Sequence, residues 1–183
     1  MDETQIQPQT TPTIPASDAG TAETLERATF AAGCFWGVEA TFREIEGVVR
    51  TSVGYTGGAS AAPTYEEVCS GTTGHAESVD VWFDPATVSY AELLAGFWSL
   101  HDPTTPNRQG WDFGSQYRSA IFFHDAEQER IAIASREARQ RELPRPIVTE
   151  IVPASEFHDA EDYHQRYYEK HGGVIACATT VRN

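Results

Sequence analysis

A cysteine set between glycines and aromatic residues, in the sequence GCFWG at residues 33–37, is the stretch of this chain best suited to chemistry. A short apolar strand is predicted at residues 28–32 and an amphipathic helix from about residue 34 to 46, so Cys34 is expected at a helix N-terminus. Unpaired backbone N–H groups and the helix dipole favour a thiolate there. Phe35 and Trp36 add two apolar rings. The motif therefore predicts a nucleophilic cysteine beside an apolar contact surface, with a buried structural cysteine as the alternative.

A carboxyl group is the second candidate. Residues 76–83 alternate as a strand does, and Glu77 falls on the same face as Val79, Val81 and Phe83. Because the valine and phenylalanine side chains must point into the core, Glu77 is expected to point inward as well. Burial disfavours the charged form and raises the pKa of a carboxyl group. Glu77 is therefore predicted to be a proton donor, unless a structural arginine neutralises it.

The remaining polar candidates are two tyrosines, Tyr65 and Tyr117, and a second thiol, Cys177, which lies on a tail preceded by two glycines. This set suits attack by sulfur on a polar, uncharged group whose leaving oxygen must be protonated, followed by closure of a disulfide with the tail cysteine. A base for hydrolysis is less evident, since no histidine is adjacent in sequence to this set. His75, two residues before Glu77, is the histidine of most interest.

Composition limits the partners and the compartment. The 183 residues carry a formal net charge of -14, which argues against nucleic acid or an anionic membrane as a partner. No apolar run approaches the roughly 20 residues of a membrane span, and no secretory signal is evident, so we expect a cytoplasmic protein. Three cysteines without metal-type spacing indicate redox or catalytic use rather than a metal site or a disulfide framework. No dinucleotide-binding glycine motif appears, and we expect no cofactor and a monomer.

The order of the predicted elements gives the organisation of the chain. Residues 1–24 are expected to be a disordered extension, and residues 25–183 one domain with a mobile tail from about residue 171. Further strands are predicted at 48–53, 119–123 and 147–152, and helices at 89–100, 125–141 and 159–170, with loops at 54–58 and, long and irregular, at 101–117. Strands alternating with helices indicate an α/β or α+β fold, a sheet with helices packed against it.

Six motifs in succession resemble those of the A-type peptide methionine sulfoxide reductases, in that family's order and over nearly the whole of residues 28–170. They are GCFWG at 33–37, GYTGG at 54–58, PTYEEVCSG at 63–71, GHAE at 74–77, HDPT at 101–104 and GSQYRS at 114–119. The resemblance implies a mixed central sheet in a two-layer sandwich with a ferredoxin-like core. It also implies thiol-dependent reduction of the S epimer of methionine sulfoxide, free or in proteins.

The resemblance assigns roles to individual residues. Cys34 matches the nucleophile that attacks the sulfoxide sulfur and is left as a sulfenic acid, and Glu77 matches the acid that protonates the sulfoxide oxygen. Tyr65 and Tyr117 match hydroxyls that bond this oxygen. Asp112 matches a residue that fixes the substrate amide. Phe35 and Trp36 match the pocket for the substrate methyl group. Cys69 matches a non-catalytic position, and we expect it in an apolar, strand-side setting.

The C-terminus departs from the pattern of two recycling cysteines, because this tail carries one. Cys177 is interpreted as the thiol that resolves the Cys34 sulfenic acid, with thioredoxin reducing the resulting disulfide. If Cys177 has no function, an external thiol must reduce Cys34 directly. Two rival functions remain at this point: a thiol peroxidase that uses Cys34, and a non-catalytic module that binds oxidised or methionine-rich segments.

Overall fold

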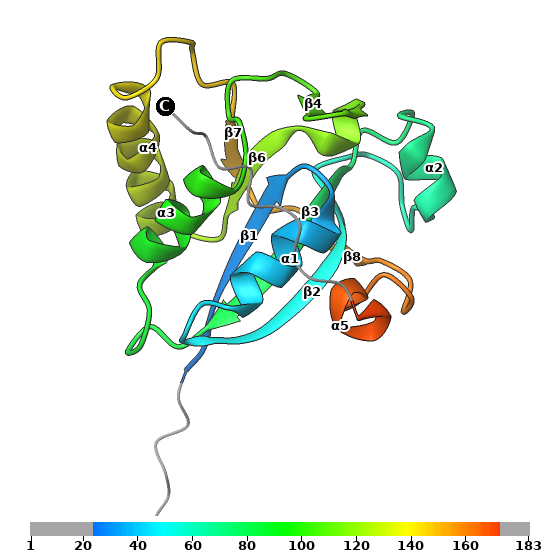
Figure 1. Ribbon diagram of the computed structural model, residues 1–183, viewed down its shortest axis with the longest axis horizontal. Helices are drawn as coiled ribbons and strands as arrows, with labels where there is room; N and C mark the ends of the chain where they lie inside the picture. Colours follow the sequence, from blue (N-terminus) through cyan, green and yellow to red (C-terminus); the bar gives the residue numbers. More distant parts are fainter. Residues whose placement is uncertain (1–23, 173–183) are drawn as a thin grey trace, which may run out of the picture.

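The computed structural model describes residues 24–172, which build one six-stranded sheet, a small hairpin and a set of helices (Figure 1). In chain order the elements are β1 (Glu26–Ala32), α1 (Phe35–Arg43), β2 (Val48–Thr56), α2 (Tyr65–Cys69), β3 (Ala76–Phe83), α3 (Tyr90–Leu100), β4 (Arg108–Gln109), β5 (Asp112–Phe113), the 3-10 helix η1 (Ser115–Tyr117), β6 (Ser119–Phe123), α4 (Ala126–Gln140), β7 (Glu150–Pro153), β8 (His158–Asp159) and α5 (Tyr167–His171).

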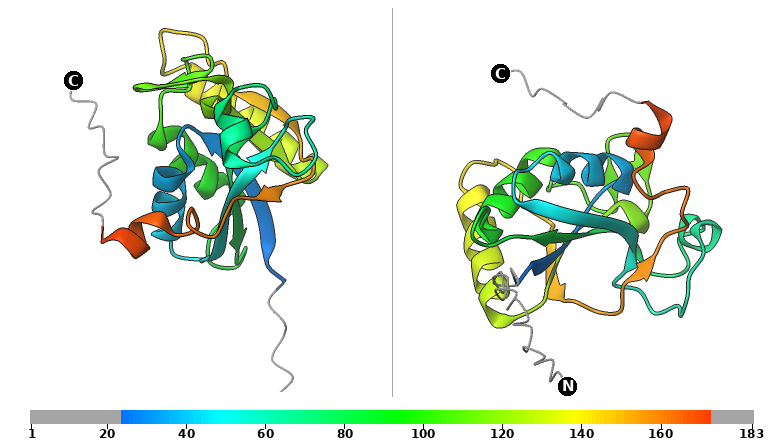
Figure 2. Two further views of the ribbon diagram at one scale, coloured as in Figure 1. Left: turned by 90° about the vertical axis from the view of Figure 1, so that its right-hand side faces the viewer. Right: turned by 90° about the horizontal axis from the view of Figure 1, so that it is seen from below.

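The large sheet has the strand order β7-β6-β1-β3-β2-β8. Only the β6–β7 pair is parallel, and the other four pairs are antiparallel, so the sheet is mixed. Helices α1 and α3 pack on one face of the central strands, and α4 packs against α3 and the outer strands β6 and β7 (Figure 2). The fold is therefore the expected mixed α/β sandwich of a sheet and a helical layer.

Local sequence explains where the helices begin. The Thr64 hydroxyl accepts from the N–H of Glu67 while the Glu67 carboxylate accepts from the N–H of Thr64, which makes a capping box before α2. The same reciprocal pair joins Ser89 and Glu92 before α3, as the sequence predicted. Asp125 caps α4 by accepting from the Gln128 N–H. None of the helices within residues 24–172 is long and apolar enough to span a membrane.

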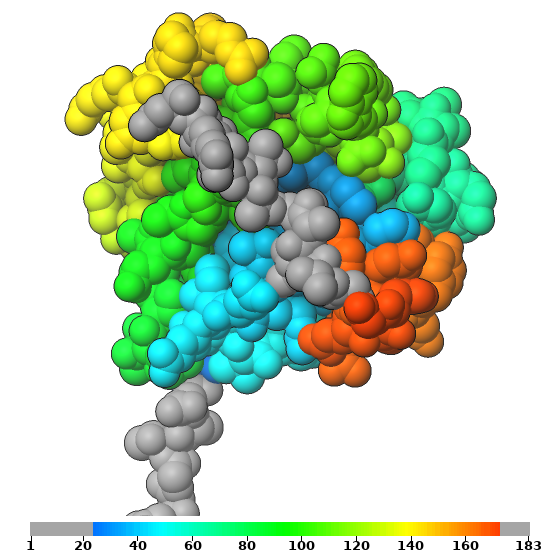
Figure 3. Space-filling view, viewed as in Figure 1, coloured from blue at the N-terminus to red at the C-terminus, as the bar shows by residue number. Residues whose placement is uncertain are grey.

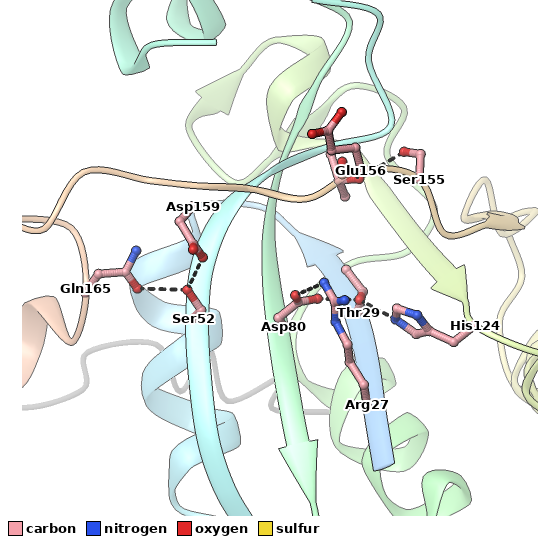
Figure 4. A network of polar contacts seen from close by, with 10 residues as sticks. Arg27, Thr29, Ser52, Asp80, His124, Ser155, Glu156, Asp159 and Gln165 are labelled. Carbon is pink, nitrogen blue, oxygen red and sulfur yellow. Dashed lines mark hydrogen bonds and ion pairs between the residues drawn. The ribbon is translucent and has the colours of Figure 1, made fainter. Parts of the chain in front are cut away.

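The second face of the sheet is covered by the link between its two edge strands. β7 and β8 lie at opposite edges, so the connecting residues 154–157 cross the sheet. Figure 4 shows this segment, with Ser155, Glu156 and Asp159 labelled, running across the strands. It packs closely: a Cβ atom on Gly54 would lie 2.3 Å from the carbonyl oxygen of His158, and the Thr56 hydroxyl donates to the carbonyl of Glu156 at 2.8 Å. Both faces of β3 are consequently buried.

Three sequence predictions need correction. Residues 54–56 belong to β2 and not to a loop, because they pair with β3 through to the Thr56–Ala76 pair. The connection over 101–117 is not wholly irregular, since it contains the β4–β5 hairpin and η1. The helix predicted at 159–170 is wrong: β8 ends at Asp159 and α5 begins only at Tyr167. Gln165 and Arg166 bond to β2 and α1, and the residues before them form turns and no helix. The extension and the tail predicted at the two ends lie almost wholly outside the described residues.

A polar network ties the covered face of the sheet together (Figure 4). Asp80 on β3 is 1% exposed and accepts from Arg27 and, at 2.5 Å, from the Thr29 hydroxyl, both on β1. His124 lies 2.8 Å from the same hydroxyl. Burial raises the pKa of Asp80 in spite of its bonds to Arg27 and Thr29. A buried carboxylate that loses its partners destabilises the fold, and partners that lose the carboxylate are left with unsatisfied hydrogen-bonding groups.

We expect Asp80→Ala to lower the free energy of unfolding by about 2 kcal/mol, because Thr29 loses its acceptor and Arg27 its counter-ion, the latter discounted because Arg27 is partly exposed. Urea denaturation measures this difference. Glu26→Ala, an exposed change on the same β1 strand, is the control and should stay within about 0.5 kcal/mol. Equal stability of Asp80→Ala and the wild type would show that the network is not stabilising.

Candidate active site

The proposed nucleophile lies at the turn between β1 and α1. Gly33 has a φ of +95°, and a Cβ atom there would lie 2.9 Å from the Cβ of Gln109, so both the backbone angle and the packing favour glycine. Cys34 is the N-cap residue of α1 and is half-buried. The first turn of α1 contains no acidic residue, so no carboxylate of its own opposes the positive end of the helix dipole at the sulfur.

Glu77 lies directly beneath this turn. Its side chain is 2% exposed, and its Oε2 accepts a hydrogen bond from the Phe35 N–H at 3.1 Å. Burial raises the pKa of Glu77 to about 7, the Phe35 bond works against that rise, and the negative charge of Asp112 adds to it. The inward orientation predicted from the alternation on β3 is therefore what the structure has. No arginine contributes to this pKa, so the alternative of a neutralising arginine is not what holds Glu77.

The two predicted tyrosines come to the same place from different elements. Tyr65 is the first residue of α2, and Tyr117 is the last residue of η1. Burial raises the pKa of both hydroxyls, and the negative charge of Glu77 raises each further. Both hydroxyls are therefore protonated hydrogen-bond donors near neutral pH, and both lie close enough to Glu77 for its negative charge to raise their pKa.

Asp112 lies on β5, with its side chain exposed. It pairs with Gln109 of β4, the residue that packs against Gly33. Its charge reaches the Glu77 carboxyl and the Tyr117 hydroxyl. The hairpin thus places Asp112 at the rim of the site.

Phe35 and Trp36 have different environments. Phe35 is 1% exposed, with its ring centroid 5.9 Å from that of Tyr55, so it forms the apolar base behind the turn. Trp36 is half-buried and held from two sides. Its indole N–H donates to His164 Nδ1 at 3.0 Å, and its ring stacks on Tyr167 with centroids 3.8 Å apart. Trp36 is therefore the ring of the pair that retains accessible surface beside the sulfur.

Three residues of the site were missed by the sequence reasoning. His164 is 1% exposed, and its ring lies 4.5 Å from Tyr65 and 5.2 Å from Phe35. Glu161 accepts from the Tyr65 N–H and from the Tyr55 hydroxyl, each at 3.0 Å. Tyr55 is buried opposite Glu77 in the β2–β3 register. No local spacing reveals His164 and Glu161, because their partners lie about a hundred residues away in the sequence.

Three other expectations have separate outcomes. His75 is buried, but it accepts from the Gly58 N–H and lies 2.8 Å from the Ser60 carbonyl, so it fixes the loop before α2. The apolar, strand-side setting expected for Cys69 is wrong: Cys69 is exposed at the end of α2, and its thiol bonds to the Tyr65 hydroxyl. Cys177 lies outside the described residues.

The site can accept a small polar group between the sulfur of the N-cap residue Cys34 and three possible donors, the Glu77 carboxyl and the two tyrosine hydroxyls, with Trp36 as an apolar wall. Within residues 24–172 no cluster of histidine, cysteine, aspartate and glutamate could hold a metal ion. Such an arrangement favours transfer of an oxygen atom to sulfur while Glu77 supplies a proton.

Comparison with known proteins agrees with this chemistry. A sequence model of the family "Peptide methionine sulfoxide reductase" matches residues 26–183. The peptide methionine sulfoxide reductase MsrA of Methanosarcina acetivorans is 61% identical over 152 residues, which cover 82% of this chain and 81% of the relative. The MsrA of Geobacter sulfurreducens is 61% identical over 156 residues, covering 84% and 96%.

A solved structure gives the same answer for the fold. The reduced form of Mxr1 from Saccharomyces cerevisiae superimposes with a TM-score of 0.80 at 34% identity, covering 89% of this chain and 94% of that one. With the family, the fold and a thiol site all in agreement, this chain belongs to the A-type peptide methionine sulfoxide reductases, enzymes that use a thiol to reduce methionine sulfoxide to methionine.

Proposed function

We propose that this site reduces the S epimer of methionine sulfoxide by way of a Cys34 sulfenic acid, with Glu77 as the general acid. The observation that carries the proposal is the Glu77 carboxyl itself: it is buried, has a pKa of about 7, and is bonded to the N–H of the residue that follows the sulfur. A carboxyl group with this pKa is about half protonated at neutral pH, so a large fraction of the enzyme can donate a proton to an oxygen atom placed beside Cys34.

The first chemical step balances without a cofactor. The Cys34 thiolate attacks the sulfoxide sulfur, Glu77 gives its proton to the sulfoxide oxygen, and the oxygen passes to the cysteine as methionine leaves. Sulfur is reduced in the substrate and oxidised in Cys34. Tyr65 and Tyr117 are assigned to hydrogen bonds with the oxygen, because both remain protonated near the carboxyl group. Their two donors stabilise the charge that develops on the oxygen.

The substrate side chain is assigned to the apolar side of the same turn. The Trp36 ring, held by His164 and Tyr167, supplies a wall for the methyl group, and the buried Phe35 ring supports it from behind. Asp112 at the rim is assigned to the amide of the substrate backbone. With the methyl group on Trp36 and the substrate backbone at Asp112, only one epimer can direct its oxygen to Glu77, and the S epimer is assigned to this arrangement.

The enzyme must then return Cys34 to its reduced state. The Cys177 thiol is assigned to attack the sulfenic acid, which forms a Cys34–Cys177 disulfide and releases water. A thioredoxin is assigned as the dithiol that reduces this disulfide. Support comes from Mxr1 of Saccharomyces cerevisiae, 27% identical with a TM-score of 0.58, whose structure is known in complex with Trx2.

Single-turnover reduction tests the reaction and the relay together. Pre-reduced enzyme without added reductant should consume the S epimer only, and mass analysis should then find a disulfide between Cys34 and Cys177. Cys34→Ser should abolish the reaction, because the nucleophile is lost. Cys177→Ser should complete one turnover and stall with thioredoxin as reductant.

A hydroperoxide turned over as efficiently as the sulfoxide would favour the peroxidase, and loss of neither epimer would rule out the proposed reaction.

The pH profile tests the general acid. The single-turnover rate should fall as the pH rises through about 7, since only protonated Glu77 donates. Glu77→Gln should lower the rate about 100-fold at neutral pH and remove this dependence. Asp80→Asn alters another buried carboxyl on β3, on the opposite face, and should leave the rate of folded enzyme within about twofold. An unchanged rate in Glu77→Gln would exclude this role for Glu77.

Asp112 provides a separate check on the electrostatics. Its negative charge opposes ionisation of Glu77, so Asp112→Asn should lower the Glu77 pKa and move the falling limb of the profile to lower pH. The shift should be a fraction of a pH unit, because burial is the larger cause. Rates measured across the pH range with dimethyl sulfoxide, which has no amide for Asp112 to bind, isolate this effect. A limb displaced to higher pH would contradict it.

A further inference from the structure

The β4–β5 hairpin presents two largely exposed aromatic rings to solvent. Trp111 is 93% exposed and Phe113 is 63% exposed, the two most exposed large apolar side chains of the described residues. Large apolar rings at the surface of a soluble protein often mark a binding surface when they gather in one place. Trp111, Phe113 and Tyr163, which is 53% exposed, are together called the aromatic rim.

The hairpin is fixed against the catalytic turn. Gln109 on β4 packs against Gly33, the residue before the proposed nucleophile. The Gln109 side chain also accepts from the Asp102 N–H at 3.1 Å and donates to the Asp102 carbonyl at 3.2 Å. The Gly114 N–H donates to the Asn107 carbonyl at 2.9 Å and closes the base of the hairpin. The rings of the hairpin are therefore carried on a part of the chain that is anchored at the site.

The two faces of the hairpin point in different directions. Opposed residues of an antiparallel pair share a face, so Gln109 and Asp112 lie on one face and Arg108 and Phe113 on the other. The first face is turned to the catalytic turn, since Gln109 touches Gly33 and the charge of Asp112 reaches Glu77. The Arg108 guanidinium lies 4.9 Å from the centroid of the Phe113 ring on the second. Trp111 lies at the tip between the strands.

Tyr163 belongs to the other side of the site. Its ring centroid is 4.1 Å from that of His164, the residue that holds Trp36. In the space-filling view, blue surface from β1 and the start of α1 lies between the green residues of the hairpin, the teal residues of α2 and the orange residues before α5 (Figure 3). The aromatic rim therefore has members on both sides of the catalytic turn.

We propose that the aromatic rim binds the apolar residues that flank an oxidised methionine in an unfolded polypeptide. The inference rests on the proposed function, because a methionine sulfoxide side chain seated at Cys34 brings the residues on either side of it toward the hairpin and Tyr163. Trp111 at the tip meets them first, and Phe113, on the face turned away from the catalytic turn, meets only the chain that passes beyond the tip. Methionine is commonly buried, and its neighbours in a segment exposed by unfolding are commonly apolar. Aromatic rings bury large areas against such neighbours without needing a fixed sequence. The net charge of -14 further disfavours acidic flanks.

The test compares substrates that differ only outside the oxidised methionine, with dithiothreitol as reductant. The substrates are free methionine-S-sulfoxide, a seven-residue peptide with leucine and phenylalanine flanks, and the same peptide with glycine and serine flanks. For Trp111→Ala/Phe113→Ala we expect kcat/KM to fall about 10-fold for the apolar peptide, through KM, and less than twofold for the other two substrates. Wild-type enzyme should prefer the apolar peptide by a similar factor.

Two controls separate the explanations. Val49→Ala removes an exposed apolar side chain at the start of β2 and should change nothing. Trp111→Ala/Val49→Trp places an exposed tryptophan elsewhere on the surface and should not restore kcat/KM for the apolar peptide. This result would exclude nonspecific binding of apolar peptides to any exposed tryptophan. Equal losses on all three substrates would overturn the proposal while leaving the reductase reaction intact. So would unchanged rates with dithiothreitol combined with a raised KM for thioredoxin in a parallel assay that uses thioredoxin as reductant. A wild type inactive on every sulfoxide would refute the proposed function instead.

Discussion

The hydrogen bond from the Phe35 N–H to Glu77 is the contact on which the rest of the site depends. It joins Phe35, the first residue of α1 and the neighbour of Cys34, to Glu77 near the start of β3, the proposed proton donor. Two opposing effects meet at this carboxyl. Burial raises its pKa, whereas the bond from a backbone N–H stabilises the charged form and lowers the pKa. The balance near pH 7 allows Glu77 to release its proton and to recover it afterwards.

The second constraint is the path of the chain after β7. Because this segment crosses the covered face and pairs beyond β2, it returns to the helix side at the start of α1 and α2. Gln165 bonds to the N–H and carbonyl of Val53, and the Arg166 N–H donates to the buried Glu39 of α1. These bonds fix His164 and Glu161 against Trp36 and Tyr65. The walls of the site are thus held by a segment far from the nucleophile in sequence.

The contrast between contacts made close in sequence and contacts made across about a hundred residues explains which parts of the molecule could be predicted. The positions of Cys34 at a helix N-terminus and of Glu77 inside the core could be predicted because local rules are enough: a glycine turn before an amphipathic helix, and the alternation of side chains on a buried strand. The strand at 119–123 and the capped helix that starts at Tyr90 follow from similarly local signals. The roles of Tyr65, Tyr117 and Asp112 came from the resemblance to a family, since nothing in their own spacing places them near Glu77.

The helix predicted at 159–170 failed for a complementary reason. Its charged and aromatic composition favours a helix, but Gln165 and Glu161 use their side chains to bond to other elements, and Arg166 adopts a left-handed φ of +51°. Tertiary bonds outweigh a propensity of a few tenths of a kcal/mol per residue. The same reasoning explains why His164 was missed.

The alternation on β3 separates chemistry from stability. Glu77 points to the helix side and takes part in the site, whereas Asp80, three residues later, points to the covered face and joins β1 to β3. Each carboxyl is buried, and burial raises the pKa of each. Only Asp80 has an arginine beside it, which holds the charge in place. Glu77 has a single N–H and no cation among the causes of its pKa, so its proton remains exchangeable. The presence or absence of one cation therefore distinguishes the structural carboxyl from the proposed catalytic one on the same strand.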